Sequence, residues 1–243
     1  MTDEHFVTLT AADGHTFRAY ISAPAEAEGA PALVLLHEIF GINKYMRTMA
    51  REFCEAGYLA IVPDLFARQE RDVELAYTGP DFDHAIQLRD RLDYTLVMED
   101  IDAAIGWVRA RAGSAAGVGV LGYCLGGGLA FMAAAGLDVD CAVSYYGVGV
   151  QDRIGLADRI EVPILFHFAE TDHYCPEPAR ELITSRFAGK TGAEAYLYPG
   201  VGHAFATYER DSFDMPSAIL AWERTIAFLG GHLSATQREG SLA

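Results

Sequence analysis

The stretch Gly117-Val-Gly-Val-Leu-Gly-Tyr-Cys-Leu-Gly-Gly-Gly128 decides the fold of this chain. An apolar strand runs into Cys124, which is framed by Gly122 and Gly126, and a run of small residues follows as a helix. This is the layout of a nucleophile elbow, with cysteine where the pattern usually carries serine. The glycines let strand and helix approach each other, and the helix N-terminus favours a thiolate and a developing oxyanion. We therefore expect Cys124 to be a covalent nucleophile rather than a packing residue.

Strands and helices alternate on both sides of this elbow. Two short strands, 5–10 and 17–21, flank a turn and predict an N-terminal hairpin. Further strands are expected at 32–37, 58–62, 117–123, 141–145, 164–168 and 193–197. Helices are expected at 44–56, 125–135, 178–187 and 216–229, and one long helical pattern follows a polar loop with Gly79-Pro80 and runs to about Arg111. Such alternation predicts an α/β fold with a mostly parallel central sheet and helices on both faces. We expect one domain over residues 1–243, with a frayed polar tail at 232–243.

The composition restricts the partners of this chain. Its 243 residues carry 34 acidic and 18 basic side chains, for a net charge of −16, which opposes nucleic acid and anionic membranes. The four cysteines are irregularly spaced, and no apolar leader or membrane-length run is present, so a reducing, cytoplasmic location is expected. No metal-ligand spacing or nucleotide fingerprint appears, so we expect no metal and no cofactor. The predicted partner is a small molecule, bound by a monomer or small homo-oligomer.

A cysteine nucleophile needs a base, and the base needs an acid to orient it. In α/β-hydrolases these partners follow the nucleophile in the order acid, then histidine, each on a loop after a late strand. Asp172 follows the strand at 164–168, and His203 follows the strand at 193–197. The oxyanion hole is expected to combine the N–H groups of Leu125 and Ile39.

Each of these assignments has an ordinary structural alternative. Asp172 could cap the helix expected after it, with Glu170 and Asp64 as other candidate acids. Glu38 could be an exposed loop carboxylate, although it lies at a strand tip that faces the expected cleft. The remaining cysteines, Cys54, Cys141 and Cys175, lack the elbow context and are interpreted as structural.

Five motifs together resemble the dienelactone hydrolase (carboxymethylenebutenolidase) family. They are His37-Glu-Ile-Phe-Gly41, Pro63-Asp-Leu-Phe-Ala-Arg-Gln69, Gly122-Tyr-Cys-Leu-Gly-Gly127, Tyr145-Tyr-Gly-Val-Gly149 and Gly202-His-Ala-Phe205. They occur in the family's order across almost the whole chain. The resemblance implies an α/β-hydrolase fold and a Cys-His-Asp triad on Cys124, His203 and Asp172. It also implies that Glu38 contacts the resting thiol and takes its proton when substrate binds.

The chain departs from the family pattern where the substrate carboxylate is bound. Two arginines do this in the family, and by alignment their positions hold Phe82 and Thr207. Loss of both contacts would leave a substrate carboxylate unpaired, at a cost of about 2–5 kcal/mol. Arg89, Arg91 or Arg210 could substitute, and helical phase does not decide among them. We therefore expect hydrolysis of lactones or activated esters that are less anionic than dienelactone.

The expected substrate contacts are Phe82, Tyr146, Phe205 and Thr207. The alternative functions are a thiol esterase or thioesterase of broader specificity and a catalytically silent binding protein on the same scaffold. A thiol redox sensor would need a resolving cysteine near Cys124, and the sequence places none there.

Overall fold

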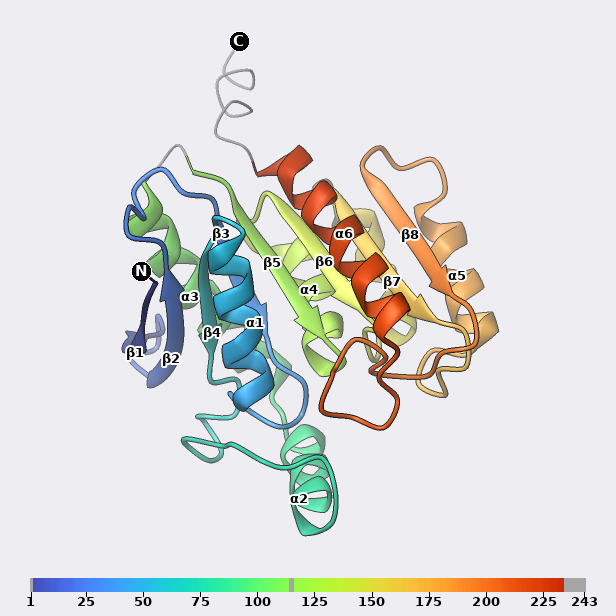
Figure 1. Cartoon of the computed structure of the whole chain (residues 1–243), viewed down its shortest axis with the longest axis horizontal. Coiled ribbons are helices and arrows are strands. Elements are labelled where there is room, and N and C mark those ends of the chain that lie inside the picture. The colour runs from blue at the N-terminus through green and yellow to red at the C-terminus, as the bar shows by residue number, and fades with distance from the viewer. Residues whose placement is uncertain (1, 114–115, 234–243) are drawn as a thin grey trace.

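The computed structural model describes residues 2–113 and 116–233, which form one twisted eight-stranded sheet covered by helices (Figure 1). The strands are β1 (Asp3–Thr10), β2 (Thr16–Ala23), β3 (Ala32–Leu36), β4 (Leu59–Pro63), β5 (Val118–Tyr123), β6 (Cys141–Tyr145), β7 (Ile164–Ala169) and β8 (Ala193–Tyr198). The helices are α1 (Lys44–Glu55), α2 (Pro80–Asp90), α3 (Tyr94–Ala112), α4 (Leu125–Gly136), the 3₁₀ helix η1 (Gln151–Arg159), α5 (Glu177–Phe187) and α6 (Met215–His232).

The strand order is β1-β2-β4-β3-β5-β6-β7-β8. The hairpin β1–β2 joins β4 antiparallel, and every pairing from β4 through β8 is parallel. The chain therefore has the mostly parallel α/β sheet that the alternation of strands and helices predicts.

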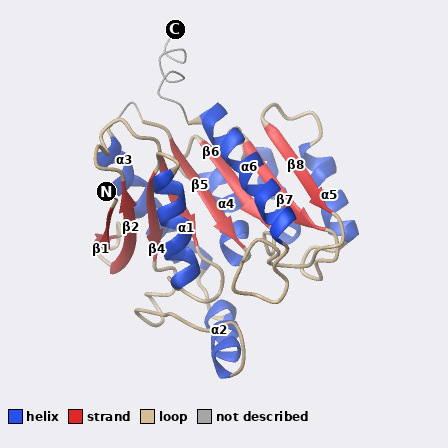
Figure 2. Cartoon of the chain, in the orientation of Figure 1, coloured by secondary structure: helices blue, strands red, loops and turns tan. Residues whose placement is uncertain are grey.

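Two apolar cores lie on opposite faces of the sheet. Along β3, Ala32, Val34 and Leu36 point into the core under α3 and α4, whereas Leu33 and Leu35 point into the core under α1 and α6. This is the two-residue alternation of a strand that is buried on both faces. Figure 2 shows α1 and α6 on the near face of the sheet.

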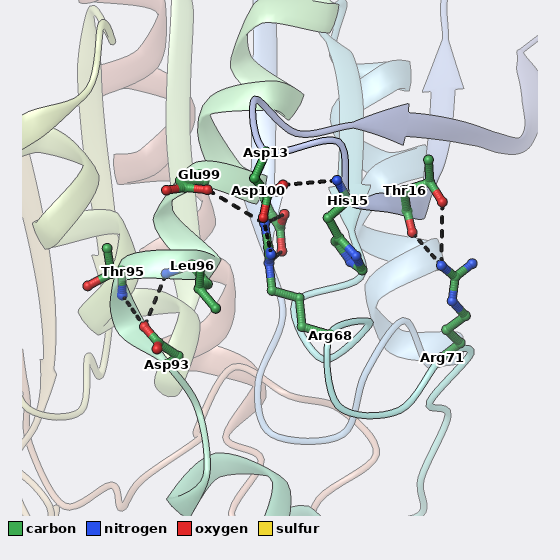
Figure 3. Close-up of polar contacts among 10 residues, drawn as sticks. All are labelled: Asp13, His15, Thr16, Arg68, Arg71, Asp93, Thr95, Leu96, Glu99 and Asp100. Carbon is green, nitrogen blue, oxygen red and sulfur yellow. Dashed lines mark hydrogen bonds and ion pairs between the residues drawn. The ribbon is translucent and has the colours of Figure 1, made fainter.

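The long helical pattern after Gly79 is two helices rather than one. α2 ends at Asp90, and the Asp93 carboxylate then caps α3 by accepting the N–H groups of Thr95 (2.9 Å) and Leu96 (3.2 Å). A capping aspartate satisfies the first free N–H groups of a helix and so marks a new start. Figure 3 shows this cap at the beginning of α3.

Arg68 connects the hairpin to α3 through two ion pairs, a partly buried one with Asp100 and an exposed one with Asp13. Its guanidinium donates to both oxygens of Asp100, at 2.8 and 2.9 Å, and to Asp13 in the β1–β2 turn at 2.6 Å (Figure 3). Asp100 is almost fully buried, so Arg68 offsets the desolvation of a charge inside the fold.

The last helix runs further than the sequence predicts. α6 continues to His232, and Leu233 is buried against the core under α1 and α6. These two residues belong to the tail expected to fray, and the rest of that tail, 234–243, lies outside the described residues. At the opposite end of the sheet, α2 and the loop between β8 and α6 lie near the tips of β5 and β6 (Figure 1). Ligand sites of open parallel sheets form at these carboxyl ends.

Candidate active site

Cys124 lies on a sharp turn between β5 and α4, with a φ of +56°. A Cβ on Gly122 would lie 2.0 Å from the carbonyl oxygen of Gly126, and one on Gly126 would lie 2.1 Å from that of Leu36. Both distances are far below van der Waals contact, so only glycine fits at either position. The turn has the strained strand-to-helix geometry of a nucleophile elbow.

The segment after β6 holds the elbow from the neighbouring strand. The Cys124 N–H donates to the carbonyl of Tyr145 at 3.0 Å, and the Val148 N–H donates to the carbonyl of Cys124 at 3.0 Å. A Cβ on Gly127 would approach the Cα of Gly147 to 2.8 Å. This close contact explains why position 147 of the Tyr145–Gly149 motif is glycine. The sequence did not predict that this motif supports the elbow.

His203 and Asp172 form a buried pair on adjacent loops. His203 Nδ1 and Asp172 Oδ2 are 2.7 Å apart, and the other oxygen, Oδ1, accepts the N–H of Tyr174 at 2.8 Å. Pro176 occupies the N-cap position of α5, so Asp172 does not cap that helix. Burial lowers the pKa of His203, and the Asp172 carboxylate opposes that shift in part. His203 Nε2 is buried without a hydrogen-bond partner among the described residues, which leaves this nitrogen free for proton transfer.

The two N–H groups expected in the oxyanion hole come from the loop after β3, at Ile39, and from the first residue of α4, Leu125. Neither Ile39 nor Leu125 donates to a backbone carbonyl within the described part of the chain. The Leu125 N–H lies close enough to the Cys124 sulfur to lower the pKa of the thiol. These two donors are therefore available to a negatively charged oxygen.

His37 positions the loop that carries Glu38 and Ile39. Burial lowers the pKa of His37 to about 4, so the ring is neutral. The Leu65 N–H donates to Nε2 at 3.1 Å, so Nδ1 bears the proton and donates to the carbonyl oxygen of Glu38. The sequence reasoning quoted His37 within a motif but gave it no role.

Glu38 is buried, and its partner is Arg210. Arg210 Nη1 and Glu38 Oε1 are 3.5 Å apart and form an ion pair. Neither Glu38 oxygen makes a well-formed hydrogen bond with any described residue. Burial raises the pKa of Glu38 to about 7, although Arg210 lowers it in part. Arg210 is therefore the arginine that reaches the site. Arg89 instead pairs with Asp90, and Arg91 donates to the carbonyl of Gln87.

The Cys124 thiol is held in its protonated form. Burial raises its pKa above the ordinary value, and the Glu38 carboxylate raises it further. A negative charge beside a buried sulfur disfavours a second negative charge. A thiol in this state is protected from oxidation, because the thiolate is the form that oxidants attack.

A cavity of about 440 Å³ opens beside His203. Phe82 and Tyr77 line one side, and Arg210 is the arginine in its wall, together with the acidic residues Glu209 and Asp211. Arg210 therefore contacts both the cavity and Glu38. Arg210 also lies 5.6 Å from the ring centres of Phe40 and Tyr77, which restrict its position.

The other expected substrate contacts lie deeper in the protein. The Tyr146 ring is 5.1 Å from the ring of His203, and its hydroxyl is 3.1 Å from Thr207 Oγ1. Thr207 and Phe205 are completely buried and do not line the cavity. Phe205 packs between the rings of Tyr146 and Tyr198, so it supports the site from behind.

The parallel sheet, the elbow at the tip of β5 and the two loops after β7 and β8 define an α/β-hydrolase. The sequence profile of the Dienelactone hydrolase family matches residues 17–233, and the chain belongs to that family of hydrolases.

Relatives named as carboxymethylenebutenolidases match along nearly the full length. The carboxymethylenebutenolidase of Pseudomonas putida is 38% identical over 92% of this chain and 94% of its own. Carboxymethylenebutenolidase 1 of Cupriavidus pinatubonensis is 36% identical over 92% of this chain and 95% of its own. A structure from Klebsiella pneumoniae, provisionally named a dienelactone hydrolase, superposes with a TM-score of 0.81 at 25% identity, over 95% of this chain and all of that one.

Two further properties concern only the part of the chain that the structure describes. None of its helices is both long enough and apolar enough to cross a membrane. Within residues 2–113 and 116–233, no three His, Cys, Asp or Glu side chains gather where they could hold a metal ion.

Proposed function

We propose that this hydrolase opens lactones and esters by nucleophilic attack of the Cys124 thiolate on the carbonyl carbon. The observation that carries this is the His203–Asp172 pair beside the elbow, with His203 Nε2 buried and unpartnered among the described residues. The tetrahedral oxygen accepts the N–H groups of Ile39 and Leu125. The ring or ester C–O bond then breaks to give a thioester on Cys124, which water hydrolyses.

Glu38 is the proposed base that generates the thiolate. A buried carboxyl with a pKa near 7 is matched to proton transfer at neutral pH. When Glu38 takes the thiol proton, its negative charge disappears, so the thiolate forms without a like charge beside it. Glu38 then passes this proton to the leaving oxygen, and the neutral His203, oriented by Asp172, activates the water that hydrolyses the thioester.

The proposed substrates are neutral or weakly anionic lactones and esters. Arg210 is the arginine in the cavity wall, and it is already paired with Glu38. A substrate carboxylate would compete with Glu38 for this arginine and would lie near Glu209 and Asp211. Phe82 instead offers an apolar contact where the family pattern has a cation, which favours an uncharged substituent.

A panel of lactones and esters tests the proposal on the wild type and on Cys124→Ala. We expect Cys124→Ala to lose about a thousandfold or more in kcat, because removal of a nucleophile abolishes the covalent route. Among substrates, kcat/KM for dienelactone should not exceed that for neutral lactones and p-nitrophenyl esters. Undiminished hydrolysis by Cys124→Ala would rule out the nucleophile, and a large preference for dienelactone would overturn the substrate class.

Cys124→Ser adds a second comparison within the same experiment. A serine hydroxyl depends on its base more than an intrinsically nucleophilic thiol does. We expect the serine variant to be slower than the wild type and to lose proportionally more activity when Glu38 is also replaced by Gln. Equal losses in both backgrounds would mean that Glu38 is not the base of the nucleophile.

A further inference from the structure

We propose that a second cavity, between α1 and α6, binds a small organic cation. Its volume is about 300 Å³, and its wall contains six aromatic side chains, from α1, β5, β6, the loop between β8 and α6, and α6 itself. They are Tyr45, Tyr123, Tyr145, Tyr208, Phe213 and Trp222. It shares no lining residue with the cavity beside His203, so it is a distinct site.

The aromatic rings surround this cavity from different directions. The ring of Tyr45 meets that of Tyr123 at 76° and that of Tyr208 at 62°, with ring centres 5.6 and 5.3 Å apart. Rings at such angles form a cage rather than a flat stack. The faces of aromatic rings carry partial negative charge, and cages of Tyr and Trp bind quaternary ammonium groups through cation–π contacts.

Glu52 supplies a full negative charge to the same wall. Tyr45, Met49 and Glu52 follow at intervals of four and three residues along α1, so they share one face of the helix. Burial raises the pKa of Glu52, and Glu52 in turn raises the pKa of Tyr123, so the carboxylate and the phenol are close. Glu52 forms no salt bridge with any residue that the structure describes.

The charge of this wall selects the class of ligand. Glu52 is the sole Asp, Glu, Lys, Arg or His side chain in the lining, and burial raises the pKa of the lining tyrosines Tyr45 and Tyr123. Arg51, the neighbouring cation, lowers the pKa of Glu52 but does not line the cavity. The Glu52 carboxylate would repel an anion, and no cation in the lining would offset that repulsion. A neutral apolar molecule would gain no electrostatic attraction from Glu52. A compact alkylammonium ion uses both the rings and the carboxylate.

The test compares choline with its neutral isostere 3,3-dimethylbutan-1-ol in titration calorimetry. The chain has two tryptophans, so Trp107→Phe leaves Trp222 as the single fluorescent reporter for a parallel titration. We expect choline to bind about tenfold more tightly than the neutral alcohol, because only the cation gains the cation–π and carboxylate contacts. Equal affinities, or no binding of choline, would overturn the proposal.

Three variants locate the site. Trp222→Leu and Tyr208→Ala should each weaken choline binding several-fold, and Tyr208 is exposed enough that its loss leaves folding intact. Glu52→Gln should weaken it about threefold, while Glu55→Gln on the same helix, outside the lining, should leave it unchanged. Equal effects of Glu52→Gln and Glu55→Gln would mean that general charge, not this cavity, attracts the cation. A dimer in sedimentation that dissociates in Ile219→Glu and binds no choline would assign this face to a second copy of the chain.

Discussion

Ionisation of Glu38 destabilises the folded protein, because its carboxyl group is buried and makes no well-formed hydrogen bond with the described residues. Its pKa of about 7 lies above the ordinary value of 4.5. Between these two values the unfolded chain releases a proton that the folded chain retains. Glu38 therefore lowers the stability of the fold as the pH rises from about 4.5 to 7.

The first prediction follows from this linkage. Glu38→Gln should unfold at higher denaturant concentration than the wild type at pH 8, with a gain of about 3 kcal/mol. At pH 4, below both pKa values, the gain should nearly vanish, because the carboxyl is then protonated in the folded protein and mostly protonated in the unfolded chain. Urea unfolding at the two pH values measures it. An equal difference at both would show that the pKa of Glu38 is not raised.

Arg210 sets the pH at which Glu38 can act. Its positive charge lowers the pKa of Glu38, so Arg210→Gln should raise that pKa. The acid limb of the kcat/KM profile for a neutral p-nitrophenyl ester should then move to higher pH, by about one unit. Arg89→Gln, which removes an exposed cation paired with Asp90, is the matched control and should not move it. A limb that stays in place for Arg210→Gln would contradict Glu38 as the base.

At the scale of single residues, the sequence predicted the site side chains that lie in short motifs. It did not predict the contacts that depend on the path of a loop. Asp172 and His203 were expected to pair because each follows a strand tip, and they lie 2.7 Å apart. Arg210 could not be separated from Arg89 and Arg91. Its contact with Glu38 depends on the course of the loop between β8 and α6, which no local periodicity describes.

At the scale of elements, the elbow requires glycine at two close contacts, Gly122 against the carbonyl of Gly126 and Gly126 against the carbonyl of Leu36. Gly126→Ala would place a Cβ 2.1 Å from the carbonyl oxygen of Leu36 and force β3 away from α4. We expect loss of activity and a destabilisation of about 3 kcal/mol or more. Gly106→Ala, in the middle of α3 with open space around it, is the control and should stabilise by about 0.5–1 kcal/mol. Thermal unfolding of both variants decides the matter, and a mild effect of Gly126→Ala would contradict this account of the elbow.

The break between α2 and α3 marks where element prediction failed. Residues 80–111 are uniformly helical in pattern, and no glycine or proline separates the two helices. The signal was Asp93, whose carboxylate caps α3, but an aspartate also occurs in exposed helix interiors. α3 also packs against β3 and β4, and these tertiary contacts are not visible in the local pattern.

At the scale of the whole molecule, Arg68 joins segments that are distant in sequence. It links the turn at Asp13 with Asp100 in α3, so it holds the antiparallel hairpin to the parallel body of the sheet. Arg68→Met would leave Asp100 buried without its partner, and we expect a loss of about 3 kcal/mol in the free energy of unfolding. Adding Asp100→Asn should recover part of this loss, because a neutral amide costs less to bury. Chemical denaturation measures both variants, and no recovery would mean that Arg68 acts through packing alone.

The global architecture was predictable because it rests on patterns that span the chain. Strands buried on both faces read as continuous apolar runs, and their alternation with helices limits the sheet to a parallel core. The contacts that support the elbow were harder to predict. Gly127 touches Gly147, and the sequence alone does not show that these two motifs meet.

The most direct test of the central claim is mass spectrometry of the protein quenched during turnover of p-nitrophenyl acetate. We expect an acetyl group on the peptide that contains Cys124, absent in Cys124→Ala and accumulating in His203→Gln, where hydrolysis of the thioester is slowed. An acetyl group on another residue, or full hydrolysis by Cys124→Ala without any adduct, would contradict it.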